Sequence, residues 1–318
     1  MATRARPDHD TFVHPALFYR SEQDYLSALI PFITSGLALG EPVAAAVPSG
    51  NLTVLRQALG TDAAHVRLLD MTKAGRNPGR IIAGVLRAFA DTHPDRHVRI
   101  IGEPIWPSRT PTEYPACVQH EALINTAFTD RDVTIVCPYD AARLTAETLT
   151  DATATHPLLW EGLAERSSER YAPSETIDRY NLPLDPPPDL PVTAAGHAAT
   201  GPELSRVRRF TVEQGRLHGL APERIQDLEL IVTELVTNSL LHAQTPGVVH
   251  IWPDEDHLIC QVSDTGRLTD PLAGRRPPTR GQRGGLGLLL VNDLADLVRT
   301  HLSDAGTTIR AYLRRRPQ

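Results

Sequence analysis

Three observations predict a two-domain protein: an α/β domain with a mostly parallel sheet, followed by an α+β domain. First, a chain of 318 residues can bury two separate cores. Second, five of the ten residues from Leu182 to Pro191 are proline, which predicts a stiff, extended linker. Third, strand-like and helix-like segments alternate before the linker, whereas helices precede strands after it. We therefore expect domains at residues 1–181 and 199–318, joined by a linker at residues 182–198.

The first half alternates short apolar runs with amphipathic segments. The apolar runs predict strands at residues 43–47, 66–69, 98–101 and 133–137. The amphipathic segments predict helices at residues 22–38, 51–58, 80–92 and 115–127. This order is typical of a parallel sheet covered by helices, and such sheets bind ligands beyond the carboxyl ends of their strands.

The second half begins with helices rather than strands. Its patterns predict helices at residues 203–218 and 222–242, followed by strands at residues 248–252 and 258–263. A glycine-rich loop comes next, and after it a helix at residues 286–297 and a last strand at residues 307–313. This order indicates an α+β domain in which helices cover a mixed or antiparallel sheet.

The composition argues against several classes of protein. The formal net charge of −6 gives no broad basic surface for binding nucleic acid. The three cysteines form no C-x-x-C pair, so neither a disulfide framework nor a zinc site is predicted. No apolar run approaches the roughly 20 residues of a membrane span. We therefore expect a cytoplasmic protein that acts without nucleic acid or membrane.

The most informative pattern is a polar stripe in an otherwise apolar segment. Glu234, Asn238 and His242 are spaced four residues apart, so they share one face of an α-helix. An amide oxygen one turn from a carboxylate suits a magnesium-nucleotide site, because Mg²⁺ prefers oxygen ligands. Asn238 would then bind the metal, and Glu234 would accept a proton from a nucleophile. Taken alone, the stripe also fits the solvated edge of a surface helix.

Two glycine-containing segments downstream fit the same interpretation. Asp264 follows a strand-like run and precedes Gly266 by two residues. Its carboxylate could accept a hydrogen bond from the exocyclic amine of adenine, while the glycine lets the ring approach the backbone. A second glycine cluster precedes an apolar helix, whose first amides can bind phosphate oxygens. Neither a Rossmann glycine pattern nor a P-loop is present. The loop between the two segments could act as a lid that brings an arginine to the phosphates: Arg275, Arg276, Arg280 or Arg283.

Together these segments resemble the N, G1 and G2 boxes of the GHKL (Bergerat) ATPase superfamily. Residues 234–243 and 284–296 are most similar to anti-sigma factor serine/threonine kinases of the RsbW type, and the resemblance spans about residues 199–313. It implies ATP and Mg²⁺ as cofactors, with Glu234 as catalytic base, Asn238 as metal ligand and Asp264 reading adenine. Other nucleotide-binding positions implied by the resemblance are Gly266, Gly284, Gly285, Gly287, Thr308 with its neighbour Thr307, Arg283 and His242. For His242, a simple partner of the helix dipole is the preferred interpretation.

The first half carries a different set of motifs, at residues 14–19, 70–72, 75–82, 101–106, 120–125 and 137–140. Over about residues 14–156 these motifs resemble the MEDS sensory domain. The resemblance implies a RecA-like or Rossmann-like α/β fold that senses an unknown small molecule. Taken singly, Asp70, Asn77 and Asp140 are also typical of helix caps or turns, and His120 and Glu121 of packing or surface residues. The candidate ligand-binding residues are His14, Tyr19, Asp70, Arg76, Glu103, Trp106, His120, Glu121, Tyr139 and Asp140.

The two resemblances predict an anti-sigma factor that senses a ligand or a partner. It would sequester a sigma factor and use Mg·ATP to phosphorylate a STAS-type anti-anti-sigma protein on serine or threonine. No phospho-acceptor helical hairpin precedes the ATP-binding segment, so histidine phosphotransfer is not expected. Anti-sigma factors of this kind are often dimers, so a homodimer is compatible with the resemblance. The alternative is a non-catalytic ATP-binding module that controls a transcription regulator through protein contact.

Overall fold

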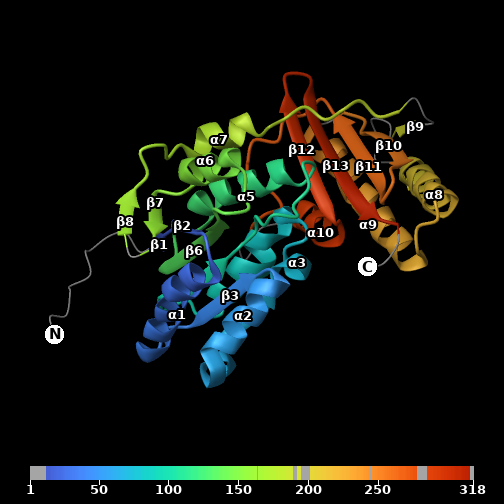
Figure 1. Cartoon of the computed structure of the whole chain (residues 1–318). Coiled ribbons are helices and arrows are strands. Elements are labelled where there is room, and N and C mark those ends of the chain that lie inside the picture. The colour runs from blue at the N-terminus through green and yellow to red at the C-terminus, as the bar shows by residue number, and fades with distance from the viewer. Residues whose placement is uncertain are drawn as a thin grey trace. The chain divides into compact units, whose positions relative to one another are not determined.

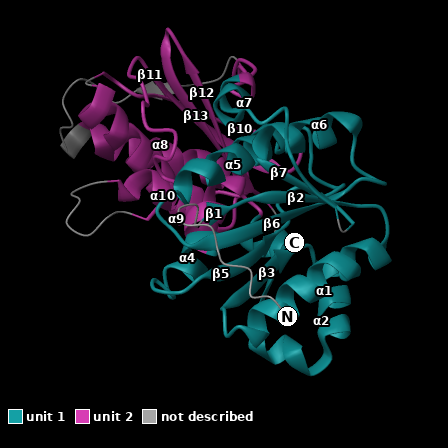
Figure 2. Ribbon diagram, turned by 90° about the vertical axis from the view of Figure 1, so that its left-hand side faces the viewer, with its two compact units in different colours: residues 1–75, 85–178 teal, residues 76–84, 179–318 magenta. Residues whose placement is uncertain are grey.

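The chain folds into two compact units, coloured separately in Figure 2. The computed structural model describes residues 12–162, 164–188, 192–194, 201–243, 245–277 and 285–315. Unit 1 contains residues 1–75 and 85–178, and unit 2 contains residues 76–84 and 179–318. None of the described helices combines the length and the apolar character that a membrane crossing requires.

Unit 1 is built on an eight-stranded sheet with the strand order β4-β3-β5-β6-β2-β7-β8, in which β1 also pairs with β6. All of these pairings are parallel except that of β7 with β8. The mostly parallel α/β fold predicted for the first half is therefore confirmed. The strands are β1 (Phe12–Val13), β2 (Pro15–Tyr19), β3 (Val43–Val47), β4 (Arg67–Asp70), β5 (Val98–Gly102), β6 (Val133–Asp140), β7 (Leu158–Glu161) and β8 (Ala164–Ser167).

Helices cover both faces of the unit 1 sheet (Figure 1). On one face, Leu29 and Ile33 of α1 and Leu55 of α2 pack against buried strand residues, while α5 and α6 cover the other face. α1 begins at a capping residue, because the Ser21 hydroxyl accepts a hydrogen bond from the Asp24 amide at 3.1 Å. The helices are α1 (Glu22–Ala38), α2 (Ser49–Leu59), α3 (Met71–Ala74), α4 (Ala88–Ala90), α5 (Tyr114–Ala127), α6 (Ala146–Thr155) and α7 (Pro173–Arg179).

Unit 2 contains a five-stranded antiparallel sheet with the order β12-β13-β11-β10-β9. One core joins α8, α9 and α10 to this sheet, through Val207, Val232 and Val291 of the helices and Cys260 and Ala311 of the strands. The α+β fold predicted for the second half is therefore confirmed. The elements are β9 (Val192–Ala194), α8 (Gly201–Leu217), α9 (Pro222–Asn238), β10 (Val248–Pro253), β11 (His257–Asp264), α10 (Leu286–Leu294), β12 (Leu297–Ser303) and β13 (Gly306–Arg314).

Unit 2 also includes a short segment from the first half of the sequence, Arg76–Gly84. Asn77 is fully buried; its amide nitrogen donates to the backbone carbonyl of Asn292 at 2.7 Å, and its amide oxygen accepts from the Val298 amide at 3.2 Å. Asn292 lies on α10 and Val298 on β12. The segment therefore anchors the helix that follows the glycine cluster.

Three local expectations were wrong. The helix predicted at residues 286–297 ends at Leu294, and the next apolar run forms β12. The helix predicted at residues 80–92 is divided into a 3₁₀ turn, the π-helical segment Ile82–Arg87 and α4. The strands β1, β2, β7, β8 and β9 were not anticipated, because their apolar runs are short and carry little periodic signal.

Candidate functional site

The ends of two helices in unit 2 bring the polar stripe and the glycine cluster together. Glu234 and Asn238 lie in the last turns of α9, and Gly287 lies in the first turn of α10. A Cβ atom added to Gly287 would lie 2.5 Å from Glu234 Oε2 and 3.5 Å from the Asn238 amide nitrogen. Any side chain at this position would fill the space in front of the carboxylate. The backbone amides at the start of α10, which have no acceptor within the helix, therefore lie beside the acid and amide of α9.

α9 does not reach His242 as a regular α-helix. It ends at Asn238, and Ser239–Ala243 form a π-helical turn. A π turn contains more residues than an α turn, so His242 leaves the straight stripe formed by Glu234 and Asn238. The same turn directs Ser239 towards β11. Such single π turns are frequent at functional sites.

Asp264, at the end of β11, is fixed by two hydrogen-bond donors. The Ser239 hydroxyl donates to Oδ2 at 2.6 Å, and the backbone amide of Gly266 donates to Oδ1 at 2.8 Å. Each carboxylate oxygen can accept a further hydrogen bond, so an amine of a ligand can still be bound. A side chain at Gly266 would collide with Ala243, because an added Cβ would lie 2.3 Å from the Ala243 Cβ. Ser239 had not been singled out from the sequence.

Thr307 and Thr308 project from opposite faces of β13. In the antiparallel register Thr307 is opposite Asp264, and Thr308 is opposite Ser263. The Thr307 hydroxyl donates to the Gly266 carbonyl at 2.8 Å, whereas the Thr308 hydroxyl lies 3.1 Å from that of Ser263. Thr307 is therefore the threonine that braces the segment around Asp264.

A cavity of about 370 Å³, within the size range of small-molecule sites, opens between these elements. An adjoining cavity of about 490 Å³ contains Glu234 and shares Gly287 and Pro277 with the first. Arg80 lies in its wall, 2.8 Å from Asp293. Arg280, Arg283 and Gly284 lie outside the described residues. The sequence-predicted residues that line the first cavity are Asn238, His242, Asp264, Gly266, Arg276, Gly285, Gly287 and Thr307.

In unit 1, two of the sensory candidates meet in a buried cluster. Glu103 is 1% exposed, and its carboxylate accepts hydrogen bonds from the hydroxyls of Tyr19 at 3.2 Å and Tyr25 at 3.3 Å. The Asn51 amide nitrogen lies 2.9 Å from both Glu103 oxygens. Burial raises the pKa of Glu103 to about 8, although these hydrogen bonds lower it. Tyr25 and Asn51 lie in predicted helices without any motif, so sequence reasoning missed them.

The raised pKa of Glu103 predicts that unit 1 loses stability as the pH rises. An unfolded glutamate ionises near pH 4.5, whereas Glu103 keeps its proton up to about pH 8. Between these values the folded chain holds the extra proton, so raising the pH favours unfolding, by on the order of a few kcal/mol. Glu103→Gln cannot ionise and should remove this dependence. Denaturant unfolding at about pH 5 and about pH 9 checks it; equal pH dependence in both proteins would contradict the assignment.

The other exposed or half-buried candidates have local structural partners. Asp70 and Asp140 each accept a hydrogen bond from the backbone amide two residues later, at 3.0 and 3.1 Å. The Trp106 ring lies under the Arg109 guanidinium, 3.7 Å from its Cζ atom. Arg76 belongs to unit 2, where it pairs with Asp296 at 2.9 Å. The structure therefore does not gather these four residues into one site.

The remaining candidates are buried in unit 1: His14, His120, Glu121 and Tyr139. Burial, together with the neighbouring His156, lowers the pKa of His14 to about 4, so its imidazole is neutral at pH 7. Cys137 and His156 lie beside His14 and Glu121. Sequence reasoning did not select Cys137 or His156, because their spacing along the chain matches no short metal-ligand or catalytic motif.

Comparisons with known families agree with this division of the chain. Residues 13–157 match a family model described as the MEthanogen/methylotroph, DcmR Sensory domain, MEDS. Residues 198–313 match one described as a Histidine kinase-like ATPase domain. No curated protein was found to match the chain. Both family resemblances inferred from the sequence are confirmed at this level.

Proposed function

Because the chain carries a MEDS sensory domain and then a histidine kinase-like ATPase domain, we propose that it is a sensory anti-sigma factor kinase. Its second domain binds Mg·ATP, sequesters a sigma factor and phosphorylates a STAS-type anti-anti-sigma protein on serine or threonine. Its first domain senses a small molecule or a partner protein. The proposal implies a cytoplasmic protein, since sigma factors act there.

One observation carries the catalytic part of the proposal: the approach of Gly287 to Glu234 and Asn238. The missing side chain leaves the space in front of the Glu234 carboxylate open, 2.5 Å from where a Cβ would lie. The start of α10 supplies backbone amides and the positive end of the helix dipole at this place. An anion with a bound cation fits this site. The backbone amides of α10 would face the anion, and the side-chain oxygens of Glu234 and Asn238 would face the cation.

Each residue of the site then has a distinct task. Glu234 accepts the proton of the attacking hydroxyl, and the amides at the start of α10 bind phosphate oxygens. Asn238 offers its amide oxygen to Mg²⁺, which when bound neutralises charge on the phosphates. Asp264, which is held by hydrogen bonds from Ser239 and Gly266, accepts a hydrogen bond from the exocyclic amine of adenine.

The segment Arg76–Gly84 supports regulation of this site. Its sequence neighbours on both sides belong to unit 1, whereas Asn77 holds α10 and β12 by hydrogen bonds of 2.7 and 3.2 Å. α10 carries Gly287 in its first turn. A change in the path of this segment would therefore move the helix that binds the phosphates.

Titration calorimetry with Mg·ATP and transfer of radiolabelled phosphate to co-purifying proteins test the proposal. We expect saturable ATP binding and labelling of an anti-anti-sigma protein on serine or threonine. Binding without transfer to the co-purifying anti-anti-sigma protein would favour the non-catalytic module instead. Absence of Mg·ATP binding by the folded chain would contradict both functions.

A further inference from the structure

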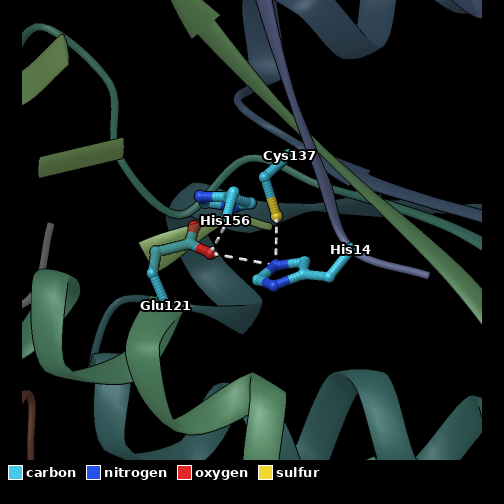
Figure 3. A group of neighbouring side chains, drawn as sticks. All are labelled: His14, Glu121, Cys137 and His156. Carbon is cyan, nitrogen blue, oxygen red and sulfur yellow. Dashed lines mark hydrogen bonds and ion pairs between the residues drawn. The ribbon is translucent and has the colours of Figure 1, made fainter. Parts of the chain in front are cut away.

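The interior of unit 1 holds four metal-ligating side chains that converge on one point (Figure 3). His14 lies between β1 and β2, Glu121 on α5, Cys137 on β6 and His156 directly after α6. Each of the four residues is at most 1% exposed. Their possible ligand atoms all lie within 4.8 Å of one another. Four separate segments of the fold are therefore needed to assemble the cluster.

Three distances within the cluster match the edges of a coordination tetrahedron. Glu121 Oε2 lies 3.5 Å from His14 Nε2 and 3.3 Å from His156 Nε2, and Cys137 Sγ lies 3.4 Å from His14 Nε2. Zinc bonds of about 2.0–2.3 Å place tetrahedral ligands roughly 3.3–3.7 Å apart. The two Glu121 oxygens and His156 Nε2 make no hydrogen bond of acceptable geometry within the described structure. These buried polar atoms thus face one another without the hydrogen bonds that burial normally requires.

Hydrogen bonds outside the cluster orient both imidazoles towards its centre. The Asn125 amide nitrogen donates to the carbonyls of Ala122 and Thr155, at 3.1 and 2.8 Å, which leaves its amide oxygen facing His14 Nδ1 at 3.1 Å. His156 Nδ1 donates to the Ala152 carbonyl at 2.9 Å. With the protons on Nδ1, both Nε2 atoms direct lone pairs at the Glu121 carboxylate. Metal-bound histidines are held in this way.

The charges of the cluster also balance around a divalent cation. Two neutral imidazoles, one carboxylate and one thiolate carry two negative charges in total, which a divalent cation cancels. A neutral cluster can be buried, whereas an isolated buried charge is costly. Mixed sulfur, nitrogen and oxygen donors in a closed, buried set favour zinc over magnesium or calcium, which prefer oxygen alone.

We propose that His14, Glu121, Cys137 and His156 form a four-coordinate site for a divalent transition metal, with Zn²⁺ as the cation that fits best. Binding releases the Cys137 thiol proton to solvent and forms one bond from each side chain to the metal. The site ties the start of β2 to β6, α5 and the end of α6. It gives the sensory domain a dependence on metal that does not involve the nucleotide site.

The test uses the full chain, stripped with a chelator and then titrated with Zn²⁺ or Co²⁺. We expect one tightly bound ion per chain, a rise in the unfolding temperature, and, with Co²⁺, an absorption band from cobalt–thiolate bonding. Zn²⁺ should also slow modification of Cys137 by a thiol reagent in the unaltered protein. Failure of the unaltered chain to bind either ion, or binding without a thiolate band, would overturn the proposal.

Matched variants locate the bound ion. Cys137→Ala should lose the cobalt–thiolate band, whereas Cys260→Ala, which removes a buried cysteine from unit 2, should keep it. Asn125→Ala leaves all four ligands in place but removes the partner of His14 Nδ1, so we expect metal affinity to fall roughly 10–100-fold. An unchanged band in Cys137→Ala, or equal loss in both cysteine variants, would contradict the assigned ligands. If Cys137→Ala does not fold, the Asn125→Ala affinity and the protection of Cys137 decide the matter.

Discussion

Replacement of Glu234 by glutamine is expected to abolish most phosphoryl transfer while ATP binding changes little. Glutamine keeps the size of the side chain, but it cannot accept the proton of the attacking hydroxyl. Loss of a general base typically lowers the rate by about 10²–10⁴-fold. Single-turnover transfer of labelled phosphate to the anti-anti-sigma protein measures the rate, and calorimetry with Mg·ATP measures binding.

Glu223→Gln provides the matched control for this experiment. Glu223 is exposed in the first turn of α9, so its replacement removes the same charge from the same helix, away from the cavities. We expect normal transfer by this variant. Transfer at the unaltered rate by Glu234→Gln would show that Glu234 is not the base, whereas a parallel loss of ATP binding would assign it to nucleotide or metal binding.

The sequence indicated the features of the candidate site that depend on local spacing. Glu234 and Asn238 lie one helical turn apart in any α-helix, and a glycine cluster before an apolar run marks a helix start. The π turn after Asn238 could not be predicted, because the α-helical spacing of the sequence continues through His242. For the same reason Ser239, which fixes Asp264, had no signal in the sequence. Strand register decides whether Thr307 or Thr308 contacts the segment around Asp264. A sequence with two adjacent threonines does not reveal that register.

The fold was predictable where apolar runs were long or bounded by clear turns. The bounds of α1 matched the expected helix, since Ser21 provides a capping signal and the apolar spacing is helical. β12 was hidden because its first residue, Leu297, continues the helical spacing of Leu290 and Leu294 in α10. Where the spacing continues in this way, periodicity does not mark the point where a helix becomes a strand.

The cluster of His14, Glu121, Cys137 and His156 shows which groupings of side chains the spacing rules do not find. The three cysteines argued against a zinc site because none stands in a C-x-x-C pair. That rule describes sites formed by one loop or hairpin. In unit 1 the parallel pairing of β2 with β6 aligns Ala16 with Cys137, and so brings residues more than 100 positions apart into one layer. Only the assembled sheet and its two covering helices place His14, Glu121 and His156 around that cysteine.

The second large effect is expected at Asp264, whose replacement by asparagine should weaken ATP binding roughly 10- to 150-fold. Both carboxylate oxygens accept hydrogen bonds, from Gly266 and Ser239, and asparagine replaces one acceptor oxygen with an amide NH2 group, which only donates. A hydrogen bond to a charged group contributes about 1.5–3 kcal/mol, which corresponds to that loss of affinity. Asp304→Asn, in the exposed turn after β12, should bind ATP normally.

Competition between ATP and GTP separates a direct contact of Asp264 with the base from general damage to the site. Adenine presents an amine where guanine presents a carbonyl oxygen, so a carboxylate attracts the first base and repels the second. The amide NH2 group of the asparagine in Asp264→Asn can donate to the guanine oxygen. The ratio of the ATP affinity to the GTP affinity should therefore fall. Equal losses for ATP and GTP would instead mean that Asp264 acts by holding Ser239 and Gly266 in place.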